Sequence, residues 1–60
     1  MEKMKIKKYE LYEKYKRAGD AKLIGTYYNK QELNERIKRE RYRDKWNEFI
    51  FFVNEVIEEI

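Results

Sequence analysis

The sequence of 60 residues contains no cysteine, histidine, proline or serine, and its only glycines are Gly19 and Gly25. Without cysteine and histidine, the chain lacks the side chains for disulfide bonds and for the usual structural zinc sites. A chain of this length buries only about 60% of the surface that its unfolded form exposes, so its own core needs a supplement. Self-association is the supplement that remains.

The side chains for catalysis are missing as well. Nucleophilic mechanisms place Ser, Cys or Thr beside a base, and Thr26 is the only one of these residues in the chain. The two glycines have neither the dinucleotide-binding nor the P-loop spacing, and the carboxylates do not have the spacing of a calcium loop. We therefore expect no enzymatic activity, no cofactor and no bound metal.

Long apolar runs are also absent. A helix needs about 20 consecutive apolar residues to span a bilayer, and no stretch of the sequence is close to that length. The charged N-terminus also differs from a secretory signal peptide. Six Tyr, three Phe and one Trp argue against a disordered chain. These features predict a single folded domain over residues 1–60, located in the cytoplasm and not bound to a membrane.

Charges of the two signs occupy different parts of the sequence. Residues 1–45 contain all fifteen Lys and Arg together with eight Asp and Glu, a net charge of +7. Residues 46–60 contain four Glu and no cation, a net charge of −4. Such a division is typical of a protein with two surfaces that have different roles.

The N-terminal half predicts a β-hairpin. Residues 22–28 form a short β-branched and aromatic segment, which indicates a strand. Residues 1–18 fit either a strand or a helix whose apolar stripe starts at Met1. Because the strand at 22–28 needs a hydrogen-bonding partner, we favour a hairpin of strands at about 5–15 and 22–28. The alternative is an all-α helical hairpin.

The C-terminal half predicts a long helix, which makes the expected fold α+β. Asn29 is a suitable N-cap, and Glu32 stands three residues later as a capping-box partner. No Gly or Pro follows, so the helix is expected over about 30–60. At about 100° per residue, the apolar positions before and after 38–45 lie on opposite sides. The helix is therefore either kinked at 38–45 or packed on two different partners.

The last fifteen residues are too apolar for an exposed helix. Nine of them are aromatic or aliphatic, and a two-stranded hairpin covers only one side of a helix. We therefore predict a homodimer rather than a compact monomer, since exposed apolar patches of this size promote association. The expected dimer contacts are Trp46, Phe49, Ile50, Val53, Val56, Ile57 and Ile60.

The remaining cations and tyrosines predict a partner-binding surface. The basic first half of the predicted helix is either a solvated surface with internal ion pairs or a contact for nucleic acid or an acidic protein. Hairpin tyrosines either stabilise the hairpin by cross-strand pairing or serve as binding anchors. The candidate partner-binding residues are Tyr12, Tyr27, Tyr28, Lys14, Lys16, Arg39 and Arg43.

The run Lys8-Tyr9-Glu10-Leu11-Tyr12, followed after a turn by residues 22–33, resembles the opening of many small phage and prophage proteins of Gram-positive bacteria. Unlike many of them, the chain has no Gly in residues 34–45 for a helix-turn-helix. Its size and Lys/Glu-rich composition are also similar to those of small phage anti-defence proteins. The resemblance implies a homodimeric inhibitor or adaptor that binds a host protein in the host cytoplasm and counters a bacterial defence system. A small dimeric nucleic-acid-binding protein is the alternative.

Overall fold

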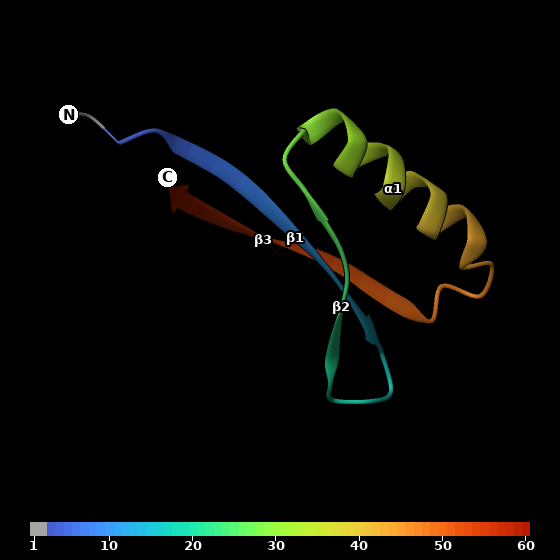
Figure 1. Ribbon diagram of the computed structural model, residues 1–60. Helices are drawn as coiled ribbons and strands as arrows, with labels where there is room; N and C mark the ends of the chain where they lie inside the picture. The colour runs from blue at the N-terminus through green and yellow to red at the C-terminus, as the bar shows by residue number, and fades with distance from the viewer. Residues whose placement is uncertain (1–2) are drawn as a thin grey trace.

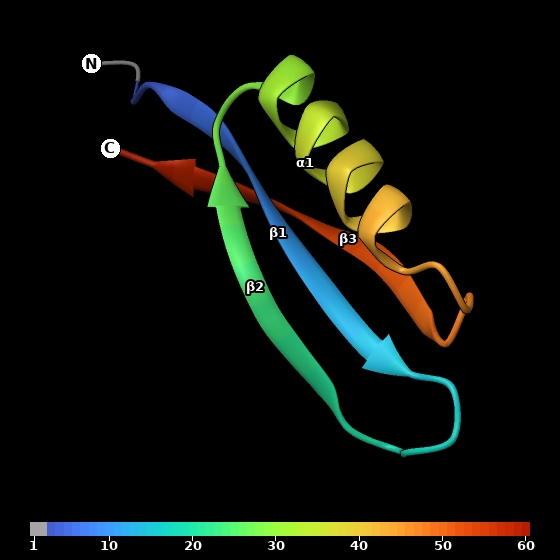
Figure 2. The ribbon, with the colours of Figure 1, turned by 90° about the vertical axis from the view of Figure 1, so that its right-hand side faces the viewer.

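The computed structural model describes residues 3–60, and this part of the chain contains three strands and one helix. In chain order they are β1 (Lys5–Tyr15), β2 (Ala21–Tyr27), α1 (Lys30–Arg43) and β3 (Phe49–Glu59) (Figure 1). The strands form one antiparallel sheet in the order β2-β1-β3, so β1 is central and β2 and β3 are the edges. The helix connects the two edge strands and lies on one side of the sheet (Figure 2).

The prediction of a helix over 30–60 is wrong, because α1 has 14 residues and is followed by the 11-residue strand β3. Phe, Val and Ile dominate the first part of β3, and these aromatic and β-branched side chains favour strands. β3 also pairs with β1 over its whole length, which satisfies the backbone of both strands. The change of apolar phase around 38–45 therefore marks the end of the helix and not a kink.

β1 and β2 occupy the places of the two expected hairpin strands, and the all-α alternative is wrong. The start of the helical stripe at Met1 lies outside the described residues. Leu11 lies opposite Gly25 and Tyr12 opposite Leu23, so Ile24 is an extra residue in a β-bulge. The bulge fixes which residues of β2 share a face with those of β1.

Asp44 ends the helix and positions the start of β3. Its N–H donates to the Glu40 carbonyl at 3.0 Å. Its carboxylate accepts hydrogen bonds from the amides of Glu48 and Phe49, each at 3.0 Å. Asn47, in the loop between Asp44 and Glu48, has a φ of 51°, in the left-handed region that Asn adopts more readily than most residues. The loop therefore reverses the chain without Gly or Pro.

At the other end of α1, Asn29 is the N-cap, as expected, and its side chain accepts a hydrogen bond from the amide of Gln31.

The interface between α1 and the sheet is small. Among residues 3–60, the buried apolar side chains are Leu11 and Leu33, which are 0% and 4% exposed. Arg36 adds a polar link, because its guanidinium donates to the Glu40 carboxylate at 2.9 Å and to the Tyr27 hydroxyl at 3.0 Å. The bonds to Glu40 and Tyr27 raise the pKa of Arg36. The apolar core thus consists of one leucine from β1 and one leucine from α1.

The molecule is flat and extended for its length. It measures 50 × 24 × 10 Å and has a radius of gyration of 13.8 Å, whereas a compact domain of this length has about 10 Å. Its accessible surface is 5367 Å², against about 4,300 Å² for a compact protein of the same mass. A single chain therefore leaves much of its apolar surface uncovered.

Leu33→Ala tests the small core. Removal of this buried side chain should lower the free energy of unfolding by about 2–5 kcal/mol, because a cavity remains in its place. Urea unfolding followed by circular dichroism measures the change. Tyr42→Ala is the matched control, since it lies on the same helix and is 85% exposed, and its effect should stay within about 0.5 kcal/mol. Equal effects of the two substitutions would contradict the proposed core.

Asp44→Ala tests the loop between α1 and β3. The substitution removes the acceptor for the amides of Glu48 and Phe49, so stability should fall by about 1–3 kcal/mol. Asp44→Asn keeps one acceptor oxygen and should lose less. Urea unfolding gives the stabilities, and amide hydrogen exchange should show faster exchange at both amides. Asp20→Ala, in the exposed turn between β1 and β2, is the control. Unchanged exchange at Glu48 and Phe49 in Asp44→Ala would refute the role of this carboxylate.

Candidate protein interaction surface

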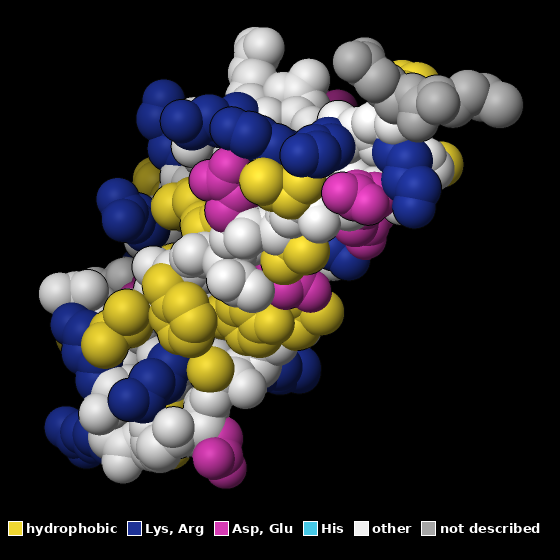
Figure 3. All heavy atoms as spheres, turned by 90° about the vertical axis from the view of Figure 1, so that its left-hand side faces the viewer, with side chains coloured by type: hydrophobic (Ala, Val, Ile, Leu, Met, Phe, Trp, Pro, Cys, Tyr) yellow, Lys and Arg dark blue, Asp and Glu magenta, His cyan; other side chains and the backbone are white. Residues whose placement is uncertain are grey.

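One face of the sheet is left uncovered by α1. Successive side chains of a strand point to opposite faces, and Leu11 and Tyr27 lie on the face that α1 contacts. On the other face Tyr12 lies opposite both Phe52 of β3 and Leu23 of β2. Figure 3 shows this face, where hydrophobic side chains gather across the middle. We call it the open face.

A cluster of four apolar side chains forms the centre of the open face. The rings of Tyr12 and Phe52 are stacked, with centroids 5.3 Å apart and planes inclined by 10°. Leu23 and Ile50 flank this pair and are each 46% exposed, while Phe52 is 41% exposed. These four residues, named the open-face cluster, are Tyr12, Leu23, Ile50 and Phe52. Stacked aromatics with aliphatic neighbours are typical anchors of protein interfaces.

Polar pairs lie beside the cluster on the same face. Glu10 accepts a hydrogen bond from the Asn54 amide at 3.1 Å. Lys8 forms an ion pair with Glu58 at 2.6 Å, and this hydrogen bond raises the pKa of Lys8. The open face therefore has an apolar end near the β1–β2 turn and a polar end near the chain termini.

The expected division of charge into two surfaces is wrong, because β1 and β3 are neighbours. Lys7 pairs with Glu55 at 3.2 Å in addition to the Lys8–Glu58 pair. The acidic C-terminal segment thus lies against lysines of the N-terminal segment. Charges that are far apart in the sequence neutralise each other in the sheet.

The residues predicted for the dimer do not form a helical stripe. Ile50 and Val56 lie on the open face, and Phe49, Val53 and Ile57 alternate onto the other face. The predicted contacts outside β3 are both exposed: Trp46 is in the loop before the strand and Ile60 follows it. The homodimer stays a prediction, but its contact surface has to be a strand or a sheet face.

The seven predicted partner-binding residues are spread over the molecule. Tyr12 and Lys14 belong to the open face, and Lys16 follows at the end of β1. Tyr27 lies on the covered face, where its hydroxyl accepts from Arg36. Cross-strand pairing of hairpin tyrosines occurs between Tyr9 and Tyr27, whereas the bulge places Leu23 opposite Tyr12. The three other predicted residues, all exposed, are Tyr28 after β2 and Arg39 and Arg43 on α1.

The sequence reasoning missed Leu23 and Phe52 as members of the site. Phe52 belongs to five consecutive apolar residues, 49–53, and such a run is a signal of a buried or half-buried strand. No feature of the sequence singles out Leu23 as a site residue, because the bulge at Ile24 determines which residue of β1 lies opposite it. Only the register brings these two residues to Tyr12.

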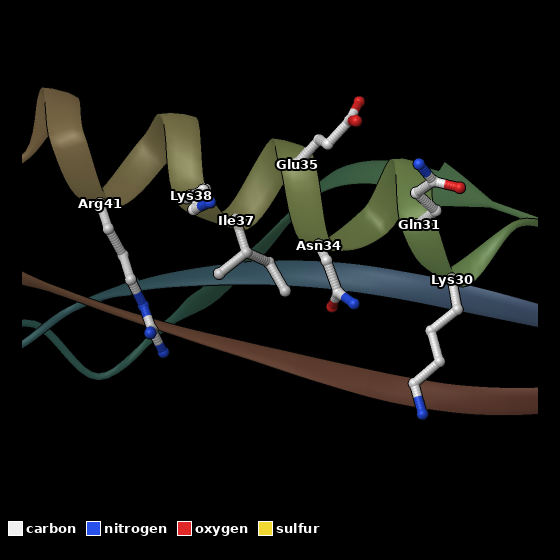
Figure 4. Close-up of a pocket in the computed structure, with 7 residues that line it drawn as sticks. All are labelled: Lys30, Gln31, Asn34, Glu35, Ile37, Lys38 and Arg41. Atoms are coloured by element: carbon white, nitrogen blue, oxygen red, sulfur yellow. The ribbon is translucent and has the colours of Figure 1, made fainter.

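A second candidate surface is the basic side of α1. Figure 4 shows a shallow pocket along the helix, with Lys30, Ile37 and Arg41 projecting toward the sheet strands. Within residues 3–60, the ion pair inside the helix joins Arg36 to Glu40, and Glu32 and Glu35 form no ion pair. The exposed cations of the helix are Lys30, Lys38, Arg39, Arg41 and Arg43.

No protein-family model, curated protein or solved structure matches this chain. The resemblance to phage proteins therefore stays a prediction. Within residues 3–60, no helix is long and apolar enough to cross a membrane. The same residues contain no group of three or more acidic side chains placed to hold a metal ion.

Proposed function

We propose that this chain is a non-catalytic protein-binding module that acts as a homodimer. The observation that carries the proposal is the number of apolar side chains that stay exposed. In residues 3–60, two apolar side chains are buried, whereas ten large hydrophobic or aromatic side chains are exposed. Four of the ten, Ile50, Phe52, Val53 and Ile57, belong to the single strand β3, and apolar side chains gathered on one element mark interaction surfaces. A second chain covers part of this exposed surface in the proposed homodimer.

The open face is the surface proposed for a partner protein. The open-face cluster supplies aromatic and aliphatic area, and Lys14 lies on the same face next to Tyr12. A partner with apolar side chains and a neighbouring acidic group fits this combination. An inhibitor or adaptor that a phage directs at a bacterial defence protein in the host cytoplasm is one specific form of the proposal. The sequence resemblance supports that form.

The homodimer is tested by the mass in solution. Light scattering at micromolar concentrations should give twice the monomer mass of 7.6 kDa. The midpoint of thermal unfolding should rise with protein concentration, because association stabilises the folded chain by mass action. A mass of 7.6 kDa at every concentration would refute the homodimer.

The exposed cations of α1 favour nucleic-acid binding as a second candidate function, since Lys and Arg neutralise phosphates. The two candidates can be separated with one pair of variants. Leu23→Lys places a charge in the open-face cluster and should abolish recovery of the partner protein in a tagged pull-down. The double variant Arg39→Glu/Arg43→Glu changes two exposed helix residues and should leave recovery of the partner protein unchanged.

The same proteins are then compared by gel shift with mixed DNA and RNA over a salt series. The protein-binding proposal expects no tight complex at physiological salt. Tight binding that weakens steeply with salt and is lost in the double Glu variant would replace it with the nucleic-acid function.

A further inference from the structure

We propose that the free edge of β3 pairs antiparallel with β3 of a second copy about a two-fold axis at Asn54, forming one six-stranded sheet. The inference rests on the proposed homodimer and specifies its contact. The order of strands becomes β2-β1-β3 followed by β3-β1-β2 of the second copy. The two α1 helices then lie on the same face, because antiparallel pairing keeps each face continuous.

β3 lacks most of the features that normally protect an edge strand, and its charged residues, Glu55, Glu58 and Glu59, lie in its second half. Natural edges are short, bulged, interrupted by Pro or marked by Lys. β3 instead has 11 residues with no Lys or Pro, and its register with β1 is unbroken. The other edge, β2, has 7 residues, a bulge opposite Leu11 and Tyr12, and Lys22. β3 is therefore the edge suited to pair with another strand.

The hydrogen bonds to β1 identify the backbone groups that point outward. Lys16 N–H donates to the Glu48 carbonyl at 2.8 Å, and Ile60 N–H donates to the Met4 carbonyl at 3.0 Å. In an antiparallel ladder, hydrogen-bonded pairs alternate with pairs that are not hydrogen-bonded. The even-numbered residues of β3 thus face β1, and the odd-numbered residues direct their N–H and C=O groups to the free edge.

The first residue of the strand agrees with this assignment. The Phe49 N–H points away from β1 and donates to the Asp44 carboxylate at 3.0 Å. Between Phe49 and Glu59, the residues whose N–H and C=O groups point outward and have no partner within the sheet are Phe51, Val53, Glu55 and Ile57. An outward row of this length is a template for a further strand.

The extent of pairing and the charges together select the register of the new pair. The outward groups meet only when odd-numbered residues lie opposite odd-numbered residues. A two-fold axis at Asn54 places Phe51 opposite Ile57 and Val53 opposite Glu55 of the second copy, so the four outward residues that remain free are all paired. An axis at Val53 would place Glu48 opposite Glu58, and an axis at Glu55 would place that residue opposite itself. Like charges directly opposite destabilise a sheet, and the axis at Asn54 avoids both pairs.

The same register brings apolar side chains together on both faces. On the open face Phe52 lies opposite Val56 of the second copy. On the other face Phe51 lies opposite Ile57, which is 58% exposed in the single chain. Aromatic and β-branched cross-strand pairs of this kind stabilise sheets. The open-face cluster stays accessible, so each dimer presents two copies of it.

Introduced cysteines test the register, because the chain has no cysteine of its own. Asn54→Cys should form a disulfide across the two-fold axis, since residues in a pair that is not hydrogen-bonded have Cα atoms about 4.5 Å apart. A mixture of Phe52→Cys and Val56→Cys chains should form a covalent heterodimer more readily than either variant forms a homodimer. Tyr42→Cys, on the exposed side of α1, is the control and should remain uncrosslinked under the same mild oxidation. Non-reducing gel electrophoresis measures all three results.

Amide hydrogen exchange on the unsubstituted protein gives a second readout that does not depend on a variant. At concentrations where light scattering shows a dimer, the amides of Val53, Glu55 and Ile57 should exchange slowly. Fast exchange there, with a disulfide formed by Leu23→Cys and none by Asn54→Cys, would show that the open faces stack. That result overturns the β3 contact and leaves the homodimer intact. A monomer mass instead refutes the homodimer itself.

Discussion

The pairing of β3 with β1 over 11 residues is the interaction on which the other elements depend. An isolated two-stranded hairpin is marginally stable in water, and a third strand with a packed face is what makes such a sheet persist. Because β2 and β3 are both antiparallel to β1, they run parallel to each other at opposite edges. The connection between them has to cross a face of the sheet. α1 makes that crossing, which brings Leu33 into contact distance of the sheet and leaves the opposite face open.

This arrangement explains why the molecule is flat. One 14-residue helix covers parts of β1 and β2, and residues 3–60 contain no further element to place on the open face. The polar link from Arg36 to Tyr27 holds the helix to β2, while Leu11 and Leu33 provide the apolar contact. The surface that a larger domain would bury internally is thus available for association.

The sequence predicted the part of the fold that depends on local signals. The β-branched segment at 22–28 and the N-cap at Asn29 both lie where the structure has a strand and a helix start. β3 was missed because strand pairing is non-local: the partner of residues 49–59 is at 5–15, and no local pattern names it. The absence of Gly and Pro then favoured a continuous helix. The carboxylate of Asp44 ends the helix through hydrogen bonds that become visible only in the folded loop.

In the candidate site, too, local sequence signals identified single residues, while non-local strand pairing determines how they are grouped. Tyr12, Lys14 and Ile50 were predicted individually, and the register of three strands determines that they share a face. The bulge at Ile24 decides that Leu23 joins them, and a shift of one residue would send it to the other face. Residue type therefore indicated which side chains are suited to binding, whereas backbone pairing determined which of them act together.

The charge complementarity of β1 and β3 has a consequence for the folding pathway. Closing the sheet brings Lys5 next to Glu59, so nearly the whole chain forms the loop that has to close. The entropic cost of loop closure rises with loop length, and contacts of long sequence separation slow folding. Lysines on β1 attract the acidic end of β3 before any hydrogen bond forms between them. The segregation of charge along the sequence thus guides the two ends of the chain to each other and disfavours wrong registers during the search.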